Sequence, residues 1–205
     1  QIRSFKRIVL TGMGTSLHAA MIARHWIENI AGIPSEWENS SEFAYRNPIL
    51  DPKTLFISIT QSGETADTLN AMHVAKQKGA TLLNICNYQE SQAEKLADQT
   101  IFMNAGVEIG VAATKTFTCS LTTIYILSMY IGHLRGNIDR SNLSNMLQEL
   151  SLLPSMMEAI LKTPKIYKDL ADKYSKYSNF LFLGRGINFP VAMEGALKLK
   201  EISYI

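Results

Sequence analysis

The feature that most constrains this sequence is the alternation of short, β-rich apolar runs with helical stretches along its first half. Strands are expected at 7–11, 54–60, 81–87 and 100–104, with helices between them at 16–31, 65–78 and 93–96. Alternation of this kind predicts a parallel sheet that helices cover on both faces. The sequence therefore predicts a three-layer α-β-α fold with ligands at the carboxyl ends of its strands.

Composition favours a globular domain and limits the classes of partner that we expect it to bind. Apolar residues make up 46% of the chain and charged residues 19%, which supplies ample material for a core. The formal net charge is +2 without any run of Lys and Arg, so we expect no nucleic-acid partner. Cys86 and Cys119 lie in apolar segments and fit reduced residues of a cytoplasmic protein. The histidines have no metal-ligand spacing, so we expect no metal and no cofactor.

An apolar segment at 116–134 carries no Asp, Glu, Lys or Arg and is long enough to cross a bilayer. It contains several Ser and Thr residues, which are unfavourable in hydrocarbon. Helices that are buried all round in a protein core are also apolar all round. We therefore expect a buried helix here and no membrane partner.

The pattern changes after this helix and then restarts. Helices are expected at 143–161 and 165–176, next to Pro154 and Pro164. A strand at 179–183, a tight turn at 184–186 and a helix at 191–204 then repeat the layout of the first unit. We predict a first domain over 1–140, connecting helices over 141–178, and the truncated start of a second domain over 179–205. One strand and one helix cannot bury a core alone.

The first candidate site is the turn at 12–16, between a strand and a helix. Gly12 and Gly14 permit a tight turn and close ligand approach, while the helix N-terminus offers unpaired N–H groups, an arrangement that suits an anion. The turn lacks the third glycine of a dinucleotide fingerprint and the lysine of a P-loop. A purely structural connection capped by Ser16 is the alternative.

The second candidate is the turn at 60–65, again between a strand and a helix. It contains Thr60, Gln61, Ser62 and Thr65, whose hydroxyl and amide groups can hydrogen-bond phosphate oxygens. Two such turns at neighbouring strand ends favour a shared phosphate site, although each could simply begin a helix. A third segment, at 108–116, could place its backbone groups next to a ligand. The alternative is that it simply leads into a helix.

The last helix carries Glu194, Lys198 and Glu201 at positions i, i+4 and i+7, and therefore on one face. A solvated row of ion pairs is one interpretation, and it would add little stability. Proton transfer is the other, because a glutamate can move a proton between sugar carbons while a nearby cation stabilises the developing oxyanion.

Several motifs, taken together and in order, resemble the sugar isomerase (SIS) domains of the glutamine:fructose-6-phosphate amidotransferase family. They are GTS at 14–16, SSEFAYRNP at 40–48, QSGETADTL at 61–69, ICN at 85–87, EIGVA at 108–112, FLGRG at 182–186 and EGALKLKEISYI at 194–205. A GTS turn alone is unspecific, but the longer motifs are highly specific. The resemblance runs over essentially the whole chain.

The resemblance implies two consecutive SIS domains and a fructose-6-phosphate site that supports amination and isomerisation to glucosamine-6-phosphate. Glu201 would shuttle the proton, Lys198 would assist at the first hydroxyl and Glu194 would support them. The implied substrate-binding residues are Gly14, Thr15, Ser16, Thr60, Gln61, Ser62, Thr65, Val111 and Ala113. The resemblance also implies a homodimer and a glutaminase domain in the intact protein.

Three positions depart from the family's common pattern: Met13 replaces Cys, Thr60 replaces Ser, and Ala113 replaces Ser. Met13 and Ala113 remove polar atoms near the sugar, which leaves a glucosamine-6-phosphate deaminase of the SIS type open as an alternative. A regulatory module that binds sugar phosphate without catalysis is a further alternative. The family's ring-opening histidine and Schiff-base lysine would lie beyond Ile205, so we expect an incomplete enzyme fragment with weak binding and poor turnover.

Overall fold

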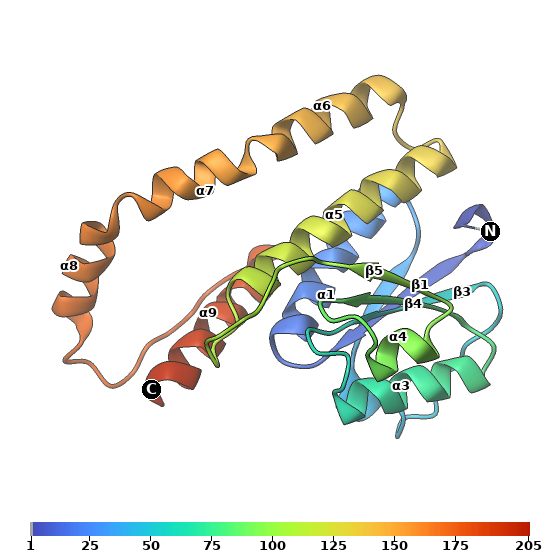
Figure 1. Cartoon of the computed structure of the whole chain (residues 1–205), viewed down its shortest axis with the longest axis horizontal. Coiled ribbons are helices and arrows are strands. Elements are labelled where there is room, and N and C mark those ends of the chain that lie inside the picture. The colour runs from blue at the N-terminus through green and yellow to red at the C-terminus, as the bar shows by residue number, and fades with distance from the viewer. Residues whose placement is uncertain (1) are drawn as a thin grey trace.

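The computed structural model describes residues 2–205, and its centre is a five-stranded parallel sheet (Figure 1). The strands are β1 (Arg7–Gly12), β2 (Ser35–Asn39), β3 (Thr54–Ile59), β4 (Thr81–Cys86) and β5 (Gln99–Phe102), in the order β2-β1-β3-β4-β5. From β1 the chain passes to β2 on one side and then returns to β3 on the other side. The topological switch point, where ligands bind in open α/β sheets, therefore lies between β1 and β3.

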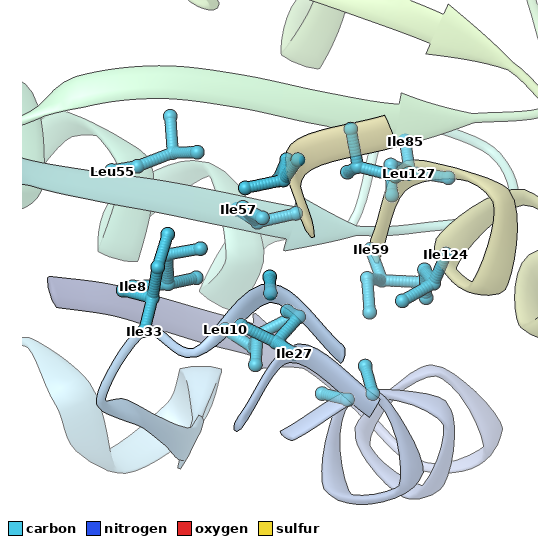
Figure 2. Close-up of a cluster of buried hydrophobic side chains, with 14 of the residues drawn as sticks. Ile8, Leu10, Ile27, Ile33, Leu55, Ile57, Ile59, Ile85, Ile124 and Leu127 are labelled. Atoms are coloured by element: carbon cyan, nitrogen blue, oxygen red, sulfur yellow. The ribbon is translucent and has the colours of Figure 1, made fainter. Parts of the chain in front are cut away.

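Helices cover both faces of the sheet, because successive strand residues point to opposite sides. Ile8 and Leu10 of β1 pack with α1 (Thr15–Trp26), the π-helical η2 (Ile27–Ala31) and α5 (Lys115–Arg135). Figure 2 shows this core, in which Ile57 and Ile59 of β3 lie beside Ile124 and Leu127 of α5. Val9 and Phe56 face the other way, into a second core. Its helices are α2 (Ser40–Phe43), α3 (Ala66–Gln77) and α4 (Gln92–Leu96).

These layers confirm the predicted three-layer fold and all four predicted strands of the first domain. The strand β2 was not predicted, because its SEWEN sequence is mostly polar. It is an edge strand, with Val9 opposite Glu36 and Leu10 opposite Trp37. Its residues are partly or largely exposed, so it carries little of the apolar signal that marks the central strands. A short 3-10 helix, η1 (Ile2–Ser4), precedes β1.

Helix α5 is the apolar segment that was weighed as a membrane span. Among the residues described, it alone has the length and composition to cross a bilayer. However, it packs on α1 and η2, and a Cβ added at Gly132 would lie 2.5 Å from the carbonyl oxygen of Ile30. Ile124, Met129 and Ile131 are fully buried. These contacts are those of a helix packed on the core, but Ile126 and Tyr130 remain exposed, so the expected buried helix is buried along one side only.

The C-terminal third departs from the sequence prediction. The helix expected at 143–161 is divided at Leu152, just before Pro154, into α6 (Arg140–Ser151) and α7 (Leu153–Leu161). With α8 (Pro164–Tyr174), these helices extend away from the sheet as an arm, and α9 (Asn188–Ser203) returns to lie along α1 (Figure 1). Every residue from 154 to 189 is exposed.

The strand predicted at 179–183 is not formed. These residues adopt neither helix nor strand, and no other described segment lies beside them as a partner strand. A strand requires hydrogen bonds to a neighbouring strand, which the local sequence pattern does not provide. The turn and helix predicted after it are present, with α9 starting three residues earlier than expected.

Candidate functional site

A cavity of about 150 Å³ lies at the switch point between β1 and β3. The turn after β1 contributes Met13, Thr15 and Ser16 to its wall. The turn after β3 contributes Thr60, Gln61, Ser62 and Thr65. The two candidate turns therefore share one cavity, as their positions at neighbouring strand ends predicted.

Three helix N-termini meet at this cavity. The helices α1, α3 and α5 all begin here, and lining residues come from the first turns of each, including Ser16, Thr68 and Thr116. Gly14 and Thr65 are the N-cap residues of α1 and α3, and neither helix has a side-chain cap. Uncapped N–H groups and the helix dipoles make such a position favourable for an anion.

Side chains fix the turn between β3 and α3. Thr60 Oγ1 accepts a hydrogen bond from the N–H of Gly63 (3.2 Å), and Ser62 Oγ accepts one from the N–H of Glu64 (3.2 Å). Gly63 has a φ of 73°, and a Cβ there would lie 2.3 Å from Ser91 Oγ. The turn is therefore held in shape without a ligand, and residue 63 must be glycine.

Glu64 follows Gly63 in the turn and precedes the start of α3. Its carboxylate does not cap α3, and instead accepts hydrogen bonds from the backbone and side-chain nitrogens of Gln92 (2.9 and 2.6 Å). This contact ties the turn to the start of α4. The amides at the start of α3 remain uncovered by a side chain.

A buried layer of hydroxyl groups supports the cavity from beneath. Thr68 Oγ1 donates to Ser40 Oγ (3.3 Å), Ser40 and Thr11 share a hydrogen bond (2.8 Å), and Thr11 also donates to the carbonyl of Glu38 (2.9 Å). Because these side chains come from three elements, they fix α3 relative to β1. The sequence analysis did not identify them.

At the third helix, α5, the carboxylate of Glu108 already lies at the N-terminus. Glu108 accepts hydrogen bonds from the backbone N–H of Thr116 (3.0 Å), its hydroxyl (2.8 Å) and the N–H of Thr114 (3.3 Å). The backbone hydrogen bond from Thr116 is the main cause that holds the pKa of Glu108 below its usual value. An incoming anion would therefore meet α1 and α3 more readily than α5.

The loop that carries Glu108 also carries the two residues predicted to contact the sugar, Val111 and Ala113, and these two lie in different places. Ala113 lines the cavity. Val111 is 90% exposed and does not line the cavity, so its contact with a sugar remains a prediction. Thr116 and Ser120 line the cavity although the sequence analysis did not select them. Their spacing of four residues at a helix start was the available signal.

Beside the cavity lies a cluster of charged groups. Thr15 Oγ1 donates to Glu194 Oε1 (2.9 Å) and accepts from Lys198 Nζ (3.0 Å). Lys198 also donates to Glu201 Oε2 (2.7 Å) and lies 3.3 Å from Glu194 Oε1. His18 Nδ1 lies 2.6 Å from the other oxygen, Glu194 Oε2. Thr15 thus joins this cluster to the wall of the cavity.

Glu194 is a buried carboxylate, only 6% exposed. Burial raises its pKa, but hydrogen bonds from His18 and Thr15 and the charge of Lys198 outweigh burial, so the pKa lies below its usual value. The row of Glu194, Lys198 and Glu201 on α9 is consequently not a fully solvated row of ion pairs. A carboxylate and an ammonium group at hydrogen-bonding distance beside a cavity can move a proton and stabilise a developing negative charge.

The cavity wall contains no Lys or Arg among the residues described, so helix N-termini and hydroxyl groups are what it offers to an anion. A doubly wound parallel sheet with a hydroxyl-lined cavity at its switch point defines an α/β ligand-binding domain. The model of the SIS domain family matches residues 1–130, which is more than half of the chain. The chain therefore belongs to the SIS domain family.

Relatives extend this similarity to the whole chain. It is 46% identical over 201 residues to a glutamine–fructose-6-phosphate aminotransferase (isomerizing) of Gloeobacter violaceus, and 44% identical over 205 residues to that of Aquifex aeolicus. The chain spans 33% of the length of each of these relatives. It also superimposes on the C-terminal domain of glucosamine-fructose-6-phosphate aminotransferase from Francisella tularensis, with a TM-score of 0.97 and 38% identity, over 100% of this chain and 58% of that one.

Proposed function

We propose that the chain is the isomerase part of a glutamine–fructose-6-phosphate aminotransferase, which binds fructose-6-phosphate and supports its conversion to glucosamine-6-phosphate. The observation that carries the proposal is the connection through Thr15 between a cavity lined by helix N-termini and hydroxyl groups and a carboxylate–ammonium cluster. A phosphorylated sugar has the two features that this arrangement requires, an anionic group and adjacent carbons that exchange a proton. The names of the relatives support the same activity.

In this proposal the phosphate lies against the starts of α1 and α3. Ser16, Gln61, Ser62 and Thr65 donate hydrogen bonds to it, with Thr60 supporting the turn. Gly14 and Thr15 contribute backbone groups, because the Thr15 hydroxyl already donates to Glu194. Val111 and Ala113 contact the sugar chain.

The residues that we propose to carry out the chemistry lie on α9. Glu201 transfers a proton between the first two carbons of the sugar, and Lys198 stabilises the oxygen on which charge develops. Glu194 supports Lys198 from its buried position. Thr15 lines the cavity and contacts both Glu194 and Lys198, which supports one bound sugar extending from the phosphate site to the charged cluster.

We further propose the setting of this domain. The first SIS domain comprises 1–140, connecting helices follow over 141–178, and 179–205 begins a second SIS domain. The intact protein carries a glutaminase domain, works in the cytoplasm and forms a homodimer. The share of the relatives' length that the chain spans and the word glutamine in their names support the additional domain.

Calorimetric titration tests the phosphate site directly. Fructose-6-phosphate, fructose and glucosamine-6-phosphate are titrated separately into the chain. We expect saturable heats for the two phosphorylated sugars and none for fructose, because fructose lacks the group that the helix N-termini would hold. Equal behaviour of fructose and fructose-6-phosphate would contradict the proposed site.

Two assays on the intact protein separate the proposal from its alternatives. A deaminase would release ammonia from glucosamine-6-phosphate and would not use glutamine, whereas a sensor without catalysis would bind hexose phosphate and convert none. We expect glutamine-dependent formation of glucosamine-6-phosphate. No contact in the structure favours either alternative.

A further inference from the structure

His18 is a buried residue with no role in the proposed chemistry. It lies in the second turn of α1, is 6% exposed and does not line the cavity. Its Nδ1 is 2.6 Å from Glu194 Oε2, although the two residues are 176 positions apart in the sequence. The contact therefore joins a helix of the sheet domain to the helix that carries Lys198 and Glu201.

The two oxygens of the Glu194 carboxylate have different partners. Oε2 faces His18, while Oε1 accepts from Thr15 and lies 3.3 Å from Lys198. Rotation of the carboxylate would disturb both sides together. Lys198 also donates to Thr15, whose hydroxyl donates to Glu194, and to Glu201, so the orientation of Glu194 affects two of the three contacts that hold the ammonium group.

The position of α9 on the sheet domain depends strongly on the contact between His18 and Glu194. Among the residues described in α9, Pro190 and Glu194 are the buried ones. Apolar residues of α9 such as Met193 and Leu197 are only half-buried, so the buried Glu194 is a more specific contact than they are. A buried carboxylate with matched donors has one favourable arrangement, since leaving it unpaired is costly.

The protonation of the pair follows from the Glu194 environment. The pKa of Glu194 lies below its usual value, so its side chain is an ionised acceptor near neutral pH. An ionised carboxylate has no proton to donate, which means that the ring nitrogen facing it carries one. The hydrogen bond thus runs from His18 Nδ1 to Glu194 Oε2.

We infer that His18 is a positioning residue: its hydrogen bond fixes the Glu194 carboxylate, which in turn holds Lys198 between Thr15 and Glu201. The inference rests on the proposed function, because the position of Lys198 matters to catalysis only if this cluster acts on a bound sugar. His18 itself is too deeply buried to reach that sugar.

Two substitutions in the intact protein separate the hydrogen bond from the shape of the side chain. The amide nitrogen of Asn falls close to the place of Nδ1, so His18→Asn retains the donor, whereas His18→Leu fills the space without one. We expect His18→Leu to lower kcat for fructose-6-phosphate conversion about tenfold to a hundredfold, the effect of an unpaired buried acceptor. His18→Asn should keep kcat within about threefold of the wild type.

The Michaelis constant, KM, distinguishes the positioning role of His18 from a merely structural role. KM for fructose-6-phosphate should change less than about threefold in both variants, because the cavity wall is intact. If His18→Leu does not fold, His18→Gln replaces it, since its amide lies near Nε2 and should likewise lose kcat. Wild-type kcat in the folded Leu or Gln variant, or equal losses in the Asn and Leu variants, would overturn the inference.

The wild-type protein and Glu201→Gln are measured alongside as references for the proposed function. An active wild type with a strongly impaired Glu201→Gln supports that function, so that a fully active His18→Leu variant would overturn the positioning role alone. A wild type that converts no hexose phosphate would overturn the proposed function and, with it, the inference.

Discussion

At the scale of single residues, Thr15 connects the two halves of the candidate site. Its side chain bridges Glu194 and Lys198, while its place at the start of α1 puts it in the cavity wall. Gly63 has a comparable importance on the opposite side of the cavity. Its positive φ and its closeness to Ser91 exclude a side chain, and the turn around it presents Ser62 and Thr65.

Replacement of Gly63 by Ala should therefore destabilise the protein and weaken phosphate binding. The new methyl group meets Ser91 and the residue keeps a left-handed backbone, so we expect the free energy of unfolding to fall by about 2–4 kcal/mol. Urea denaturation measures this change, and titration with fructose-6-phosphate measures the loss of affinity.

Gly106→Ala is the matched control. Gly106 has a similar φ of 68°, but a Cβ there has no atom within 4 Å. Its cost should be about 1 kcal/mol from the backbone alone, with unchanged affinity. If both variants lose the same stability, the contact with Ser91 does not constrain the turn.

At the scale of elements, the helices differ in how their N-termini are satisfied. The starts of α1 and α3 have no side-chain cap, whereas α5 receives the carboxylate of Glu108 from the preceding loop. This loop also carries Ala113 to the cavity wall. Glu108 therefore stabilises a helix and anchors part of the site with the same contacts.

The lowered pKa of Glu108 predicts the pH dependence of its contribution. Because the pKa is lower in the folded protein than the ordinary value of 4.5 that holds in the unfolded chain, the contribution is fully present above about pH 4.5 and is lost as pH falls through the folded value. Glu108→Gln should lower the free energy of unfolding at pH 7 by about 0.3–1 kcal/mol, because it keeps an acceptor oxygen but removes the negative charge at the helix N-terminus.

Chemical denaturation between pH 3 and pH 7 checks this expectation. The difference between wild type and Glu108→Gln should shrink below pH 4.5, where the wild-type carboxylate becomes protonated. Glu149→Gln, at an exposed position on α6, serves as the control for removing a negative charge. A difference that stays constant over the whole range would show that ionisation of Glu108 does not stabilise α5.

At the scale of the whole molecule, the sheet domain and the C-terminal arm differ in their packing. All residues of both apolar cores lie before residue 132. The arm of α6, α7 and α8 leaves this domain (Figure 1). It exposes apolar side chains such as Leu161, Ile166 and Leu170. The arm contacts the domain where α6 follows α5, and the chain returns to the domain where α9 packs on α1.

A shortened chain of residues 1–139 should therefore fold on its own. It keeps the sheet, both cores and every residue of the cavity wall. We expect one cooperative thermal transition by circular dichroism and retained binding of fructose-6-phosphate, without the proposed catalytic residues. A gradual loss of signal on heating would show that the sheet domain depends on the arm or on α9.

Local sequence patterns determined the elements of the sheet domain. Apolar runs of strand length predicted β1, β3, β4 and β5, and glycine- and hydroxyl-rich turns marked both sides of the cavity, because these signals act between residues close in sequence. The polar edge strand β2 lacked such a signal. At 179–183 an apolar run was present, but the partner strand that would make it a strand was not.

Tertiary structure alone decided the arrangement of the site. Periodicity placed Glu194, Lys198 and Glu201 on one face of a helix, but it could not show which surface that face meets. The contacts with Thr15 and His18 cross 176 to 183 positions and follow from the return of α9 to α1. The local sequence pattern alone made Glu194 look like a surface charge. Glu194 is buried because α9 returns to α1, and it therefore lies at the centre of a hydrogen-bonded cluster.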